Sequence, residues 1–111
     1  MDKALGKIES VRVGLGGYQD VMFGVAFTLR GEAWGVSDFK GFWSPSQIKR
    51  SERAQWTEEG RKEQIADAFY WLDQLMADAK VTDASKLVGK PIEATFDGMQ
   101  LKSWRLLTEV L

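Results

Sequence analysis

Apolar residues fall at every second position between residues 21 and 30, in the segment VMFGVAFTLR. Alternation with a period of two is typical of a β-strand that turns one face to the core. Residues 8–15 and 32–43 alternate in the same way, the first segment more weakly. The short connections between the three segments predict an antiparallel meander.

Between residues 57 and 79 the apolar spacing changes to steps of three and four, the period of an amphipathic helix. Thr57 is the predicted N-cap, and Glu58 and Glu59 fall in the first turn, where the helix dipole favours negative charge. We expect the apolar stripe of this helix to lie on the sheet. The stripe consists of Ile65, Ala68, Phe69, Leu72, Leu75, Met76 and Ala79.

Trp71 lies outside that stripe, about 100° around the helix from Tyr70. Its ring would either cover the edge of the sheet or meet a second subunit. An aromatic residue beyond the core stripe is a hint of an oligomer interface, so we expect a homo-oligomer.

After the long helix, Asp83 is the predicted cap of a short helix that runs to Leu87. Gly89 would end it in the left-handed conformation, with Pro91 just beyond. The predicted order is β-β-β-α-(α)-β-β in one domain, residues 1–111. This is an α+β fold, an antiparallel sheet with one long amphipathic helix packed on one face.

The last two strands are predicted to form a hairpin around Asp97 and Gly98, because this dipeptide suits a type I′ turn. In that register opposite charges face each other across the strands, which favours the pairing. The facing pairs are Phe96 with Met99, Ala94 with Leu101 and Glu93 with Lys102.

The charge balance is nearly neutral, with 15 basic and 16 acidic residues and a formal net charge of -1. Bulk electrostatic attraction to nucleic acid or to an anionic membrane therefore finds no support. No apolar run approaches the ~20 residues that span a bilayer, and the first ten residues lack the apolar core of a signal peptide. We expect a cytoplasmic protein with no membrane partner.

The chain has no cysteine and no histidine. Disulfides, thiol nucleophiles, Cys/His zinc sites and Ser-His-Asp triads are thereby excluded. The remaining acidic residues form no recognisable catalytic or metal-ligating pattern. We therefore expect a protein that is not an enzyme and has no cofactor and no metal. The acidic residues considered are Asp20, Asp38, Glu58, Glu59 and Asp97.

The segment GLGGYQD at residues 14–20 has two interpretations. The simpler is a glycine-rich hairpin turn, which the sequence favours. The alternative is a cradle in which Gly16 and Gly17 present N–H groups to a phosphate or sugar beside the ring of Tyr18. It matches neither the Rossmann fingerprint nor the Walker P-loop, because both of those lead from a strand into a helix.

Five tryptophans in so short a chain indicate either a core built on large rings or an aromatic surface for stacking. Trp34 and Phe42 are the better candidates for the core. Phe39 and Trp43 flank a turn-like Lys40-Gly41 and are the candidates for stacking on a base, with Arg12 or Lys40 as the counter-charge.

From Ile8 onward the chain resembles a family of small uncharacterised accessory proteins encoded by tailed phages and prophages. The segments that carry the resemblance are GLGGYQD, WGVSDFKGFW, WTEEGR, DAKV and LVGKPIEATFDGMQLKSWRLLTEVL. The resemblance implies a product that acts in the cytoplasm of an infected bacterial host, often against host defence.

On this basis we expect a non-enzymatic protein that binds and sequesters a nucleotide-derived immune signal. An alternative is a protein–protein inhibitor of a host defence factor. A further alternative, disfavoured by the near-neutral charge, is a single-stranded nucleic-acid-binding protein.

Overall fold

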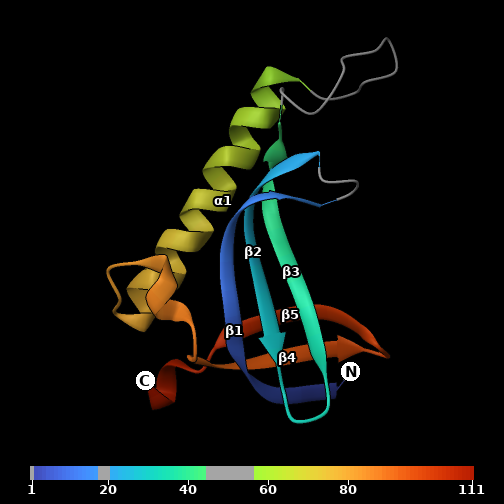
Figure 1. The fold of residues 1–111 in the computed structure, drawn as a ribbon, viewed down its shortest axis with the longest axis vertical. Helices are drawn as coiled ribbons and strands as arrows, with labels where there is room; N and C mark the ends of the chain where they lie inside the picture. Colours follow the sequence, from blue (N-terminus) through green and yellow to red (C-terminus); the bar gives the residue numbers. More distant parts are fainter. Residues whose placement is uncertain (1, 18–20, 45–56) are drawn as a thin grey trace.

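The computed structural model describes residues 2–17, 21–44 and 57–111, and it confirms the α+β fold (Figure 1). Five strands form one antiparallel sheet, and one long helix packs against it. The strands are β1 (Asp2–Gly16), β2 (Met22–Arg30), β3 (Gly35–Trp43), β4 (Pro91–Asp97) and β5 (Gln100–Leu106). The helices are α1 (Glu58–Ala79) and the short 3₁₀ helices η2 (Ala84–Leu87) and η3 (Thr108–Val110).

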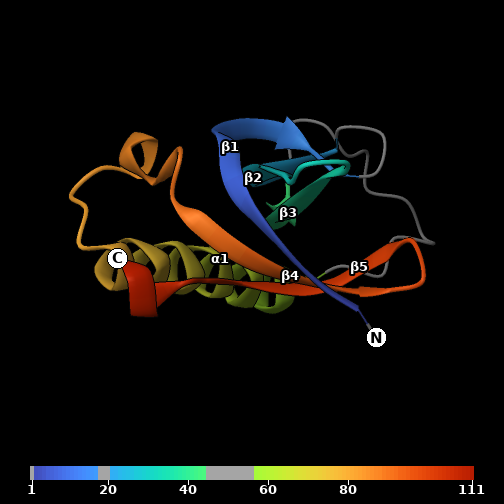
Figure 2. The same ribbon diagram turned by 90° about the horizontal axis from the view of Figure 1, so that it is seen from below.

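The sheet has the order β3-β2-β1-β4-β5, so β1 is its central strand. The first part of β1 pairs with β4 through Lys7, and the remainder pairs with β2 from Lys7 to Gly16. A bulge between Ile8 and Ser10 marks the change of partner, and bulges bend strands. β4 and β5 consequently cross the direction of β1–β3 steeply (Figures 1 and 2).

The first strand begins at Asp2, six positions before the predicted start at Ile8. The inward side chains of residues 4 and 6 in this added part are small. They weaken the alternation of apolar and polar residues in the sequence. A Cβ on Gly6 would lie 2.9 Å from the ring of Trp34, so the ring occupies the space that a side chain would need. The absence of an apolar side chain is therefore a packing requirement here.

Three rings, which we call the aromatic junction, join the two halves of the sheet and the helix. The ring of Phe27 on β2 lies 5.1 Å from that of Trp71 on α1 and 5.3 Å from that of Trp104 on β5, centroid to centroid. The indole N–H of Trp104 donates to Asp38 Oδ2 on β3 at 2.7 Å. Trp71 thus covers the sheet, the first of the two roles considered for it.

The caps of the helices are as predicted. Thr57 Oγ1 accepts a hydrogen bond from the Gly60 N–H at 3.0 Å, and Gly89 has a positive φ of 87°. Hydrogen bonds from the side chain and backbone of Ser85 hold the pKa of Asp83, the η2 cap, below its ordinary value. No helix in the described part of the chain is long and apolar enough to cross a membrane.

One residue of the predicted stripe on α1 is placed differently. Ala68, Leu75 and Ala79 are buried against the sheet, as expected. Phe69, however, is 61% exposed. It lies at the flank of the stripe, where the sheet no longer reaches it.

The predicted register of the β4–β5 hairpin is wrong. The two central turn residues are Gly98 and Met99, and Asp97 pairs with Gln100. Positive φ occurs only at the first of these two residues, as in type II′ turns, which need glycine at one position rather than two. An irregularity between Thr95 and Phe96 shifts the pairing further, so Glu93 faces Arg105 instead of Lys102.

An ion pair still crosses this hairpin, although Glu93 has a different partner from the one predicted. Arg105 lies 3.2 Å from Glu93 and also contacts Glu109 in η3 at 3.0 Å. Hydrogen bonds from Arg105 lower the pKa of Glu109, and those to Glu109 and Glu93 raise the pKa of Arg105. These interactions tie the end of the chain to β5.

We predict that Trp104→Phe lowers the free energy of unfolding by about 1–2 kcal/mol, because Asp38 loses its indole donor while the ring packing largely remains. Urea denaturation followed by circular dichroism would measure the change. Trp43→Phe is the matched control, since the Trp43 indole makes no hydrogen bond to any described residue. Equal losses in the two variants would contradict a special role for the Asp38 contact.

Candidate functional site

The sheet formed by β1, β2 and β3 has one face toward α1 and one face away from it. Phe23, Val25, Phe27 and Leu29 alternate along β2 on the side of the helix, as the contact between Phe27 and Trp71 establishes. The intervening side chains point the other way. We call that side the outer face, and it is where most of the predicted binding residues lie.

A row of three glycines crosses the outer face. Gly24 on β2 pairs with Gly14 on β1 and with Gly41 on β3, and we call these three residues the glycine row. A Cβ on Gly24 or Gly41 would overlap the backbone of the neighbouring strand. Only glycine therefore allows β2 and β3 to approach as closely as they do here.

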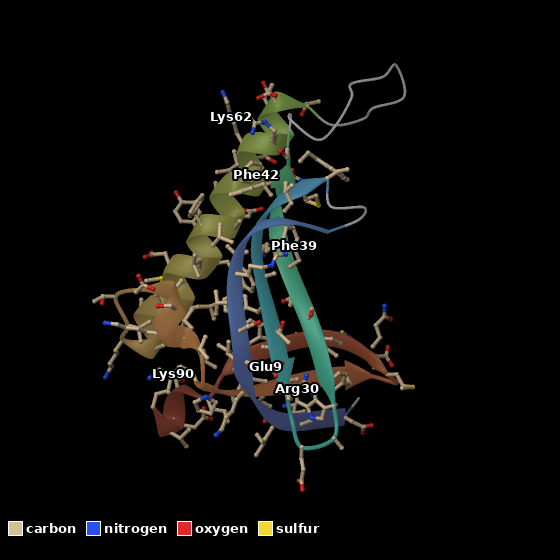
Figure 3. The ribbon with its side chains drawn as sticks, viewed as in Figure 1. Glu9, Arg30, Phe39, Phe42, Lys62 and Lys90 are labelled. Atoms are coloured by element: carbon tan, nitrogen blue, oxygen red, sulfur yellow. The ribbon has the colours of Figure 1, made fainter. Side chains whose placement is uncertain are left out.

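Gly16, one pleat beyond the glycine row, makes room for the ring of Phe39. This residue starts from β3, yet a Cβ added to Gly16 on β1 would meet its ring atoms at 2.7 and 2.9 Å. The ring consequently leans across β2 and is half-buried against the backbone, and Gly16 beneath it is buried (Figure 3). Aromatic rings that cover strand glycines in this way compensate for the missing side chains.

Arg12 lies in the same region of the outer face. It pairs with Ala26 on β2, which in turn pairs with Phe39 on β3. Its Nη2 donates to the Leu15 carbonyl at 2.8 Å. Among the described residues no carboxylate pairs with Arg12. The site thus combines a supported aromatic ring with a guanidinium whose charge is not neutralised by a described neighbour.

The other arginine of these strands is paired. Arg30, at the far end of β2, lies 2.9 Å from Glu9 (Figure 3). Its charge is therefore offset locally, whereas no carboxylate in the described part of the chain offsets that of Arg12.

The remaining predicted site residues are divided between the two faces. Trp43 pairs with Met22 at one end of the outer face. Gly17, which has a φ of 71°, follows β1 at the same end. Lys40 is on the opposite face, where its Nζ lies 5.5 Å from the centroid of the Trp71 ring. It cannot act together with Phe39. Tyr18 is outside the described residues.

The sequence predicted that the whole glycine-rich segment, residues 14–20, forms a hairpin loop. The first three of these residues instead belong to a strand. Gly14 and Gly16 belong to β1 and pair with β2. Their missing side chains make space for groups of the chain itself, the ring of Phe39 over Gly16 and the guanidinium of Arg12 over Gly14. The signal that could have revealed this is the recurrence of glycine at outward positions of three successive strands.

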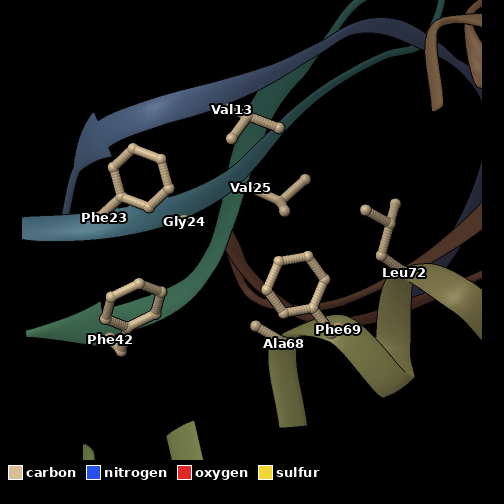
Figure 4. A pocket seen from close by; sticks show the side chains of 8 residues that line it. All are labelled: Val13, Phe23, Gly24, Val25, Phe42, Ala68, Phe69 and Leu72. Atoms are coloured by element: carbon tan, nitrogen blue, oxygen red, sulfur yellow. The ribbon is translucent and has the colours of Figure 1, made fainter. Parts of the chain in front are cut away.

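Two cavities lie away from the outer face. A small hollow of about 40 Å³ opens between α1 and the sheet (Figure 4). A groove of about 400 Å³ lies between the tips of the β2–β3 and β4–β5 hairpins, where Trp34 packs edge-on against Phe96. The groove is lined by Asp2 and by no lysine or arginine, which disfavours a phosphate ligand there. The described residues include no cluster of acidic side chains suited to a metal ion.

We predict that Gly16→Ala displaces the Phe39 ring and lowers the free energy of unfolding by about 1–3 kcal/mol, as overpacking does. In Gly16→Ala/Phe39→Ala the new methyl group has room, so the combined loss should be smaller than the sum of the two single losses. Gly35→Ala is the control, because its Cβ would contact only the flexible Arg30 guanidinium, at 3.4 Å. Additive losses in urea denaturation would contradict the packing of Phe39 on Gly16.

Comparison of the chain with protein-family models, with curated proteins and with solved structures found no match. The resemblance to phage accessory proteins stays a prediction from the sequence. A function can therefore be argued only from the geometry of the site.

Proposed function

We propose that the chain binds single-stranded nucleic acid, without catalysis, on the outer face of β1, β2 and β3. The observation that carries the proposal is the half-buried Phe39 ring, supported by Gly16 and next to Arg12, which forms an ion pair with no described carboxylate. Stacking of a base on such a ring contributes about 1–3 kcal/mol in proteins that bind single strands. A guanidinium beside the ring provides a partner for a neighbouring phosphate.

The connectivity supports the same class of ligand. A curled five-stranded antiparallel sheet, a bent first strand shared by its two halves and a helix after the third strand are the arrangement of OB folds. OB folds bind oligonucleotides on the face of their second and third strands and with the adjoining loops. This is an argument by analogy of fold, and the residues of the outer face are what make it specific to this chain.

A single strand fits this surface better than one small nucleotide does. Binding pockets for small molecules usually enclose 70–90% of the ligand surface. The described part of the outer face is an open sheet surface instead, and the groove of about 400 Å³ beside Trp34 has no cation in its lining. Sequestration of a nucleotide-derived signal, expected from the sequence, is therefore the second candidate for the same residues.

The charge of the chain sets the expected strength of binding. With a formal net charge of -1, the long-range attraction to phosphates is weak. We expect a Kd in the range of about 1–100 µM, typical of binding without sequence specificity, and a modest dependence on salt. Such a protein would act at high copy number, as the expected accessory product of a phage could.

The proposal predicts that Phe39→Ala weakens binding at least about tenfold, the equivalent of about 1.4 kcal/mol of lost stacking. Fluorescence anisotropy with a labelled oligothymidine of about 15 nucleotides would measure it. Tyr70→Ala is the control, because Tyr70 is an exposed aromatic on α1, 73% accessible and away from the outer face. A flat titration with both DNA and RNA strands would overturn the proposal.

Arg12→Gln tests the phosphate contact separately. Between about 50 and 200 mM salt, loss of one phosphate contact should reduce the slope of log K against log salt by about 0.7, the value for single strands. Competition with mononucleotides and cyclic dinucleotides belongs in the same assay. If a free nucleotide binds as tightly as the oligonucleotide does, sequestration of a small signal replaces the single strand as the function.

A further inference from the structure

Among the described residues, one edge of the sheet is open along the last part of β1. The backbone of Ile8 is still hydrogen-bonded to Gly89 and Lys90, and from Val11 to Gly16 the only described strand that pairs with β1 is β2. Figure 1 shows this part of β1 at the border of the sheet. Lysine, proline and short length commonly protect such edges from other chains. The segment Val11–Leu15 contains no lysine or proline, and Arg12 is its one charged residue.

The backbone groups on this edge can be assigned from one hydrogen bond. The Leu15 carbonyl accepts from the side chain of Arg12, which places it on the edge rather than in the ladder with β2. In an antiparallel strand the N–H and C=O groups of every second residue point to the same edge. The N–H and C=O groups of Val11 and Val13 therefore also face outward, ready to pair with another strand.

Exposed apolar side chains adjoin the open edge on the side of α1. We call them the apolar margin: Val13 (58% exposed), Leu15 (37%), Phe23 (38%) and Phe69 (61%). Val13, Phe23 and Phe69 surround the small hollow between the sheet and the helix (Figure 4). Such a contiguous group, next to unpaired strand backbone, is typical of an interaction surface rather than of scattered exposed residues.

The size of this surface suits a dimer. The exposed parts of the four side chains amount to on the order of 350 Å² of apolar area, given about 200 Å² for a whole aromatic side chain. A stable interface buries about 800 Å² on each partner, a little more than half of it apolar. The apolar margin therefore accounts for most of the apolar area that one partner of a stable dimer buries.

We infer that two copies of the chain join through β1, antiparallel and about a two-fold axis, with Val13 next to Val13 of the second copy. This register places Arg12 opposite Gly14 of the second copy. Centring the axis on Arg12 would instead put two like charges face to face, which is unfavourable. A two-fold contact pairs the outward backbone groups of β1 in one copy with those of β1 in the other. It leaves no open strand to continue the assembly.

In this register Val11 of the second copy lies opposite Leu15. Its N–H would donate to the Leu15 carbonyl and replace the bond from Arg12, whose guanidinium already lies over Gly14 on the outer face and would be released from the edge. The inference depends on the edge and the apolar margin alone, and it stands whether or not the outer face binds nucleic acid.

Light scattering after size exclusion tests the inference. We expect a mass of about twice 12.5 kDa for the unmodified chain at micromolar concentration. Val13→Glu should give the monomer mass with an unchanged circular dichroism spectrum, because the charge would be buried in the interface. Leu5→Lys is the control, a charge placed at an exposed leucine (66%) on the part of β1 that is covered by β4, where Glu93 lies opposite, and it should remain a dimer.

A covalent trap covers the case in which Val13→Glu fails to fold. The chain has no cysteine, so Val13→Cys introduces a single one, and paired strands place facing Cα atoms within disulfide range. Mild oxidation should yield a disulfide-linked dimer for Val13→Cys and none for Leu5→Cys. A monomeric unmodified chain, a dimer that Val13→Glu leaves intact, or equal cross-linking of the two cysteine variants would each overturn the inference.

Discussion

The contact of Phe27, Trp71 and Trp104 is the interaction on which the remainder of the fold depends. Each ring comes from a different element, so the junction fixes β2, β5 and α1 relative to one another. The hydrogen bond from Trp104 to Asp38 extends this connection to β3, at the other end of the sheet order. A sheet whose end strands are joined through side chains has to curl, and the bulge in β1 permits the curl.

The curl decides which surfaces remain available. Large rings and the helix fill the inside of the curved sheet, and no helix or strand in the described ranges covers the outside of β1, β2 and β3. The same bend takes β1 away from β4 after Lys7 and opens one edge of the strand. The candidate binding face and the candidate dimer edge are thus two consequences of one packing solution. Neither requires an irregular loop or a separate domain.

The elements were largely predictable from the sequence, whereas their pairing was not. Alternation along β2, the cap at Thr57 and the glycine after η2 are local signals, and the structure confirms them. The register of the last hairpin depended on which single residue takes positive φ, and a dipeptide pattern does not resolve that. The support of Phe39 by Gly16 joins residues two strands apart, a contact that periodicity cannot reveal. Lys40 was grouped with Phe39 because the two residues are adjacent in the sequence, although the alternation of a strand places their side chains on opposite faces.

Arg12 connects the two proposals. In the single chain its guanidinium lies over Gly14 on the outer face and donates to the Leu15 carbonyl at the edge, which limits its reach toward a ligand. Pairing of two β1 strands would supply that carbonyl with a backbone donor and release the guanidinium. A phosphate that binds Arg12 would in turn remove the group that obstructs the edge. Coupling between binding events is reciprocal in free energy, so dimer formation and ligand binding would strengthen each other by the same amount. The only charge on the edge would then act as the link between assembly and recognition.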